Sequence, residues 1–195
     1  MAHSRRGTPT PTLLIVDAGP GTERLERHLV PWLTSVAQAH GSFAVAVAPV
    51  HVALRPDRPE RAGSSVPWAT AVATADAVLF ATTPDDAGLL ELLLDLAGRR
   101  DRAWRLKPVA IAQPAGPAGD RVAELLETGL RALHARPLDA RLRWTDPVRA
   151  LSIGAEAAEA EARAAVHSVL DALYRAYQTL RVFRPAEPFA LVQRD

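Results

Sequence analysis

Residues 12–22 have the sequence TLLIVDAGPGT, which joins a short apolar run to a glycine-rich segment. Leucine, isoleucine and valine bounded by Asp, Gly and Pro are typical of a buried strand that ends in a tight loop. From Thr22, a residue suited to cap a helix, apolar side chains recur every three or four positions as far as Gly41. The stretch therefore predicts a strand, a loop and a helix in succession, with Pro31 inside the helix.

The same alternation continues along the chain. The pattern predicts further strands at 43–47, 77–81, 108–112 and 138–144, and helices at about 67–74, 88–96, 120–134 and 155–182. Residues 99–105 are expected to form a charged, exposed bend. Alternating strands and helices predict an open five-stranded parallel sheet with helices on both faces, which is a three-layer α/β/α fold with a long C-terminal helix added. We expect a disordered segment at 1–11, one domain at 12–184 and a tail at 185–195.

Composition excludes several classes of function. The 195 residues fit one compact domain, and a net charge of +1 gives no global attraction to nucleic acid or to an anionic membrane. The chain has no cysteine, and its six histidines lack ligand spacing, so we expect no metal site. No apolar run approaches the roughly 18–20 residues of a membrane span, and no secretory signal is present. We therefore expect a cytoplasmic protein.

Candidate chemistry lies in three loops. Ligands of open parallel sheets bind at the carboxyl ends of the strands, which here lead into loops 17–22, 82–87 and 113–119. The first loop has glycines and a helix start that suit a phosphate, although a plain threonine-capped turn explains it as well. Asp85 and Asp86 of the second loop suit acid–base work or magnesium binding, or simply cap the helix that follows. No nucleophilic arrangement is evident, so we assign no catalytic residue.

The sequence resembles a known family at several points. Residues 75–84, ADAVLFATTP, resemble the strand and flavin-binding loop of the NADPH-dependent FMN reductases, a family of the flavodoxin-like superfamily. Residues 104–111, WRLKPVAI, are similar to that family's Trp-x-x-Lys-Pro-Val strand entry. Residues 90–95 occupy the place of a family helix, and residues 116–121 are similar to its Gly-x-x-Gly-x-Arg turn.

The resemblance implies a flavodoxin-like fold and a homodimer. It also implies an NAD(P)H-dependent reductase that passes electrons through bound FMN to a flavin, a quinone or another small acceptor. Gly21, Thr22 and Arg24 match the loop that binds the FMN phosphate. The remaining cofactor-binding positions that the resemblance assigns are Thr83, Pro84, Asp85, Asp86, Gly116 and Gly119.

Departures from the family pattern support an alternative. Asp86 and Ala87 stand where the family has tyrosine and asparagine, and Glu91 replaces a lysine. Acidic side chains near a phosphate of roughly −1.5 to −2 charge are a poor electrostatic match. The alternative is a flavin-free relative that acts as a binding or interaction subunit, with the apolar residues of the tail at 189–192 as its arm. The sequence leaves open whether the chain is an enzyme.

Overall fold

The computed structural model describes residues 9–18, 26–49, 68–82, 102–144 and 156–183. Its strands are β1 (Thr12–Asp17), β2 (Ala44–Pro49), β3 (Ala77–Ala81), β4 (Pro108–Pro114) and β5 (Arg136–Trp144). Its helices are α1 (Glu26–His40), α3 (Trp68–Thr74), α5 (Pro117–Ala132) and α7 (Glu156–Leu180), with short 3-10 turns at Arg102–Trp104 (η1) and Arg181–Phe183 (η2).

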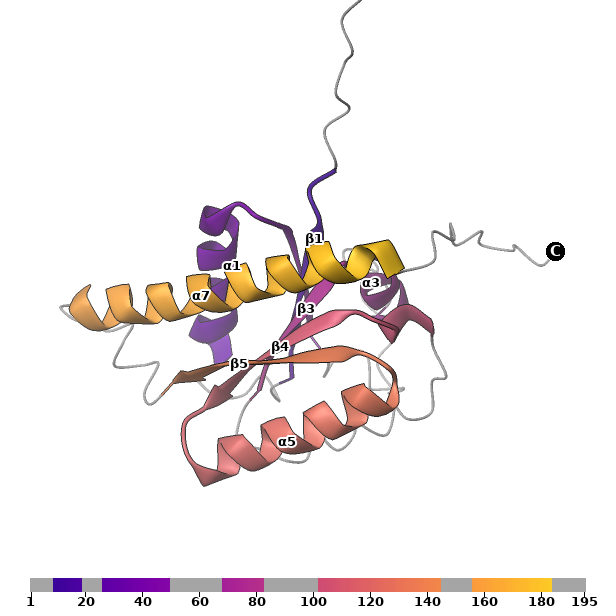
Figure 1. Cartoon of the computed structure of the whole chain (residues 1–195). Helices are drawn as coiled ribbons and strands as arrows, with labels where there is room; N and C mark the ends of the chain where they lie inside the picture. The colour runs from indigo at the N-terminus through magenta and orange to yellow at the C-terminus, as the bar shows by residue number, and fades with distance from the viewer. Residues whose placement is uncertain (1–8, 19–25, 50–67, 83–101, 145–155, 184–195) are drawn as a thin grey trace, which may run out of the picture.

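The strands form one parallel sheet in the order β2-β1-β3-β4-β5. This is the flavodoxin-like order, in which the chain starts near the middle, winds to one edge and then returns to build the other side. Figure 1 shows the sheet between helices on its two faces, with α7 along one side and α5 along the other. The predicted five-stranded parallel sheet and three-layer fold are confirmed.

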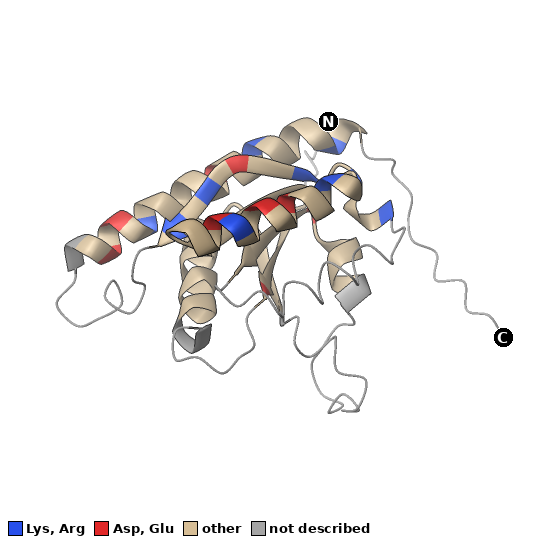
Figure 2. Cartoon of the chain, turned by 90° about the horizontal axis from the view of Figure 1, so that it is seen from below, with Lys and Arg blue, Asp and Glu red and all other residues tan. Residues whose placement is uncertain are grey.

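The interior strands β1, β3 and β4 carry a single charged residue, Asp17 at the end of β1. Figure 2 shows the charged residues mainly on α5, β5 and α7. β3, at the centre of the sheet, is buried at all five of its positions, as expected for a strand covered on both faces. β5, at the edge, has exposed and half-buried residues along its length with Leu142 buried, which confirms the prediction of a half-exposed edge strand.

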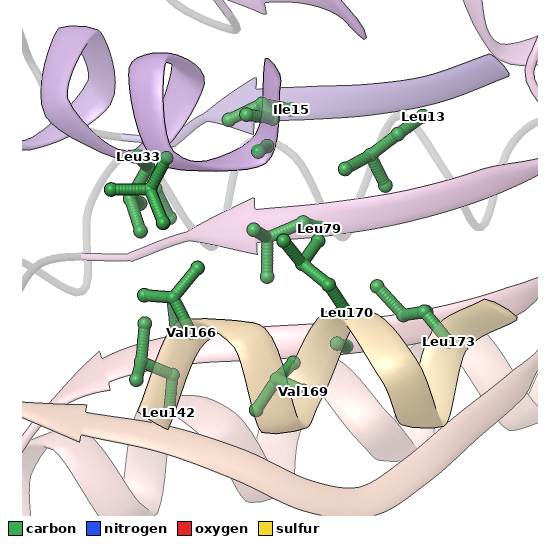
Figure 3. Close-up of a cluster of buried hydrophobic side chains, with 14 of the residues drawn as sticks. Leu13, Ile15, Leu33, Leu79, Leu142, Val166, Val169, Leu170 and Leu173 are labelled. Carbon is green, nitrogen blue, oxygen red and sulfur yellow. The ribbon is translucent and has the colours of Figure 1, made fainter. Parts of the chain in front are cut away.

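Two hydrophobic layers hold the helices to the sheet. Neighbouring residues of each strand point to opposite faces, so Leu14 and Val16 enter the layer under α3 and α5, whereas Leu13 and Ile15 enter the layer under α1 and α7. Figure 3 shows the second layer, where Val166, Val169, Leu170 and Leu173 of α7 meet the strands. The apolar stripe predicted on the last helix is therefore core packing.

Two sequence expectations need correction. The bend expected to be exposed at 99–105 contains Trp104, which is 1% exposed and stacks on Phe80 at a ring separation of 6.2 Å. The loop expected at 113–119 is shorter, because β4 continues to Pro114 and α5 already begins at Pro117. Proline is well suited to the first turn of a helix, where its missing N–H is not needed.

Some expectations fall on residues outside the described ranges. The helix expected at 88–96 lies there, as do most of the disordered segment expected at 1–11 and the tail at 185–195, so these remain predictions. None of the described helices combines the length and apolar character that crossing a bilayer requires.

Candidate functional site

The candidate site is the carboxyl edge of the sheet, where β1 and β3 meet. The chain leaves β1 toward α1 and β2 on one side, and leaves β3 toward β4 on the other. In flavodoxin-like sheets this reversal opens a crevice in which ligands bind. The register aligns Asp17 of β1 with Ala81 of β3, and the Ala18 N–H donates to the Ala81 carbonyl at 3.0 Å. The two central strands thus end side by side.

The structure describes only part of the set of site residues predicted from the sequence. Gly116 and Gly119 lie in the described part of the chain. The others are outside it: Gly21, Thr22, Arg24, Thr83, Pro84, Asp85 and Asp86. The described residues that lead into those two segments, Ala18 and Thr82, both end at the same edge of the sheet.

Thr82 extends the sheet rather than starting a loop. Its N–H donates to the Ala112 carbonyl at 2.9 Å, and its hydroxyl donates to the same oxygen at 3.1 Å. The residue is 1% exposed. Because the hydroxyl proton is already committed to the backbone of β4, Thr82 fixes the start of the second loop and is not a donor for a ligand.

The third loop is short and closely held. The Ala115 N–H donates to the Trp144 carbonyl at 2.6 Å, which ties the loop to the end of β5. Gly116 follows with a φ of 109°, a conformation that other residues rarely adopt, and a Cβ built on it would meet no atom within 4 Å. Gly116 therefore faces open space at the start of α5.

Gly119 has a different role. It lies in the first turn of α5, where an added Cβ would come within 1.9 Å of the Pro114 carbonyl oxygen. Only glycine lets the helix approach the strand end this closely. The close approach places the first turn of α5 directly over the end of β4.

A polar link that the sequence reasoning missed joins this helix to the sheet. Gln113, which is 0% exposed, donates from Nε2 to Asp120 Oδ1 at 2.7 Å, and Arg143 Nη2 lies 2.9 Å from the same oxygen. The Gln113 Oε1 atom is buried without a hydrogen-bond partner in the described structure. A lone amide at the end of an apolar strand was the only sequence signal for it.

The start of α5 leaves backbone donors unused. Gly116 supplies no side-chain cap, and helix geometry gives the first N–H groups no carbonyl acceptor within the helix. Pro117 has no N–H, so the available donors are those of Ala118 and Gly119. These groups and the helix dipole favour a negative or hydrogen-bond-accepting ligand.

The described part of this edge offers few side chains for acid–base chemistry. The residues that end β1, β3, β4 and β5 include no histidine, their hydroxyl, that of Thr82, is bonded to backbone, and their carboxylate is Asp17 at the end of β1. No group of three metal-ligating side chains occurs within the described ranges.

Comparisons with known proteins show which solved structures share this fold. No protein-family model matches the chain, and no curated protein matches it. A solved oxidoreductase from Corynebacterium diphtheriae is similar over 88% of this chain and 99% of its own, with 17% identity and a TM-score of 0.56. The NAD(P)H:quinone oxidoreductase from Methanothermobacter marburgensis is similar over 82% of this chain and 99% of its own, with 17% identity and a TM-score of 0.50. The chain thus shares the flavodoxin-like fold of these two oxidoreductases across nearly their whole length.

Proposed function

We propose that this chain is an NAD(P)H-dependent oxidoreductase of the FMN reductase type, with FMN bound at the carboxyl edge of the sheet. The observation that carries the proposal is the strand order 2-1-3-4-5, because flavodoxin-like proteins with this order bind FMN where β1 and β3 end. Two solved oxidoreductases with the same fold, one of them named for NAD(P)H and quinone, support the reaction class.

The described residues at this edge are compatible with FMN. A Cβ added at Gly116 would meet no atom within 4 Å, so the backbone there is open to a neighbouring group, and the N–H groups at the start of α5 can donate to ring or ribityl oxygens. The Asp120 carboxylate nearby is neutralised by Arg143, which removes part of its repulsion toward a phosphate.

The remaining contacts come from the predicted loop residues. Gly21 and Thr22 would surround the phosphate with backbone and hydroxyl donors, and Arg24 would supply the positive charge. Thr83, Pro84, Asp85 and Asp86 would lie along the ring. When bound, FMN supplies hydride and one-electron chemistry, so the protein is required to bind it, orient it and limit access of water.

Steady-state kinetics tests this function. Protein incubated with FMN should oxidise NADPH or NADH when a quinone such as menadione is present, at a rate proportional to protein concentration. Arg24→Gln should raise the FMN concentration needed for half-maximal rate by about tenfold, because it removes the one cation of the phosphate loop. A rate equal to that of free FMN with both nicotinamides would contradict the proposal.

A flavin-free binding subunit is the second candidate. It is favoured by the two acids and the alanine at positions 86, 91 and 87, and by the turn η2 that follows α7, where Val182 and Phe183 are 71% and 68% exposed. Exposed apolar residues of this size suit a protein contact, either with a second copy or with a partner. If the chain forms a homodimer through them, Val182→Asp with Phe183→Asp should halve the mass measured by light scattering. The matched control is Arg175→Asp with Thr179→Asp, on the exposed face of α7, which should leave the mass unchanged.

A further inference from the structure

The amino edge of the sheet, opposite the candidate site, carries a compact group of basic residues. They are supplied by two segments, 102–107 before β4 and 131–136 before β5, which backbone hydrogen bonds join. The Leu106 N–H donates to the His134 carbonyl at 2.9 Å, and the Arg136 N–H donates to the Lys107 carbonyl at 2.8 Å. We define the amino-edge basic surface as the exposed residues Arg102, Arg105, Arg131, His134 and Arg136.

Positive charge on this surface is poorly compensated. Its one carboxylate partner in the described structure is Glu127, which lies 3.2 Å from Arg131 and is already bonded to Arg141 at 2.7 Å. Arg102, Arg105 and Arg136 have no ion pair with any described residue. Elsewhere in the described structure, Arg143 and Arg163 are each paired with a carboxylate, and the exposed arginines without an ion pair, Arg121, Arg175 and Arg181, are spread over α5, α7 and η2. In Figure 2, basic segments gather where α5 ends and β5 begins.

Helix electrostatics explains only part of this group. Arg131 and His134 lie at the end of α5, where a cation is favoured by the helix dipole. Arg102 and Arg105 belong to a 3-10 turn and its exit, and Arg136 is the first residue of β5, so none of the three gains from that dipole. Since the whole chain has a net charge of only +1, the excess on this surface is a local segregation of charge.

The backbone that presents these arginines is anchored by buried side chains and by hydrogen bonds between the two segments. Trp104 and Lys107, which lie between and beside them, are buried, and the Lys107 ammonium donates to the carbonyl of Val72 in α3. Leu106 and His134 both adopt left-handed backbone conformations, with φ of 56° and 61°. Residues other than glycine pay a conformational cost there, and proteins keep such strain mainly where a fixed geometry is used.

We propose that the amino-edge basic surface docks a carboxylate-rich segment of a partner protein. Planar guanidinium groups bind carboxylates in a bidentate manner, and an anchored backbone lowers the entropy lost on binding. All five side chains are exposed, so they do not enclose a small ion. Nucleic acid is disfavoured because Trp104 is buried and no exposed Phe, Tyr or Trp lies among these residues to stack on a base. The carboxyl edge stays free when this surface is occupied.

The test uses fluorescence anisotropy with a labelled peptide of about twelve glutamates as the probe, at low ionic strength. The full-length chain should bind it, and Arg102→Gln, Arg105→Gln and Arg136→Gln together should weaken binding about tenfold. The matched control removes three exposed arginines elsewhere, with Arg121→Gln, Arg175→Gln and Arg181→Gln, and should change binding by less than about twofold. Circular dichroism on both variants checks that the fold is intact.

Four outcomes overturn the proposal. The first is the absence of binding by the unmodified chain, and the second is an equal loss in both triple variants, which would reveal a response to net charge alone. The third is tighter binding of a single-stranded oligonucleotide of equal charge than of the glutamate peptide, which would indicate a nucleic-acid surface. Inorganic phosphate should compete only through its ionic strength, and specific competition by phosphate would also contradict docking of a protein segment.

Discussion

Gln113 and Arg143 are register partners on β4 and β5, and both contact the same oxygen of Asp120: Gln113 Nε2 donates to Oδ1 at 2.7 Å, and Arg143 Nη2 forms an ion pair with it at 2.9 Å. One carboxylate in the first turn of α5 therefore ties together the ends of two neighbouring strands. The link holds the third loop of the candidate site, including the open position at Gly116, in a fixed place at the carboxyl edge of the sheet.

Gln113→Glu tests the burial of this amide. Burial and the adjacent Asp120 carboxylate both disfavour a second negative charge, so we expect a loss of about 2–4 kcal/mol in unfolding free energy at neutral pH. The penalty should shrink at about pH 5, because the introduced carboxyl then folds in its neutral form. Urea unfolding at both pH values measures it. Gln113→Leu is the control and should cost less than about 1 kcal/mol, since Asp120 keeps Arg143. A penalty from Gln113→Glu that is equal at both pH values would contradict a buried position.

Gly119→Ala tests the close approach of α5 to the end of β4. The new methyl would collide with the Pro114 carbonyl, which is backbone and cannot move aside cheaply. We expect a loss of about 1–3 kcal/mol in urea unfolding, together with weaker FMN binding as the loop shifts. Ala118→Ser, at an exposed position one residue earlier, should be nearly neutral. Equal unfolding free energies of Gly119→Ala and Ala118→Ser would mean that α5 and the end of β4 are farther apart than the structure shows.

Glu127→Gln tests the buried carboxylate shared by two arginines. Arg141 is largely buried, so loss of the charge on Glu127 leaves its guanidinium without an anionic partner, and we expect a loss of about 2–3 kcal/mol in unfolding free energy. Glu124→Gln, on the exposed side of the same helix, should cost less than about 0.5 kcal/mol. The comparison is made by chemical denaturation, and a similar small effect of both variants would refute a shared buried ion pair.

His134→Gly tests the strain at the end of α5. The His134 N–H donates to the Arg131 carbonyl and the Ala135 N–H donates to the Leu130 carbonyl, which is the pattern in which the left-handed residue is usually glycine. We expect Gly at this position to raise the unfolding free energy by about 0.5–1 kcal/mol. His134→Ala keeps the strain and should give no such gain. A thermal melt that shows the same midpoint for all three proteins would argue against the left-handed conformation.

The sequence predicts the helices and strands whose structure is decided by the local pattern of apolar residues. Residues 77–81 form a continuous apolar run, and the structure has β3 at those bounds because a central strand needs an apolar residue on both faces. The stripe on α7 was equally clear, since Val166, Val169 and Leu173 recur at helical spacing and all enter the core.

The sequence does not predict the features in which tertiary contacts override the local pattern. Trp104 stands among charged residues, which favours an exposed bend, yet stacking on Phe80 buries it. The link through Asp120 depends on which residue of β5 lies beside Gln113, and the register between these strands shifts between Val109 and Ile111. A shift of that kind has no signature in hydrophobic periodicity, so Arg143 could not be placed beside the site from the sequence.

The central claim is that the carboxyl edge of the sheet binds FMN, and fluorescence titration of FMN with the purified full-length chain tests it most directly. We expect saturable quenching at one FMN per chain. Binding should be about tenfold weaker for Arg24→Gln and unchanged for Arg175→Gln, which removes an equal charge on α7. FMN fluorescence that stays constant as protein is added in excess would contradict the account.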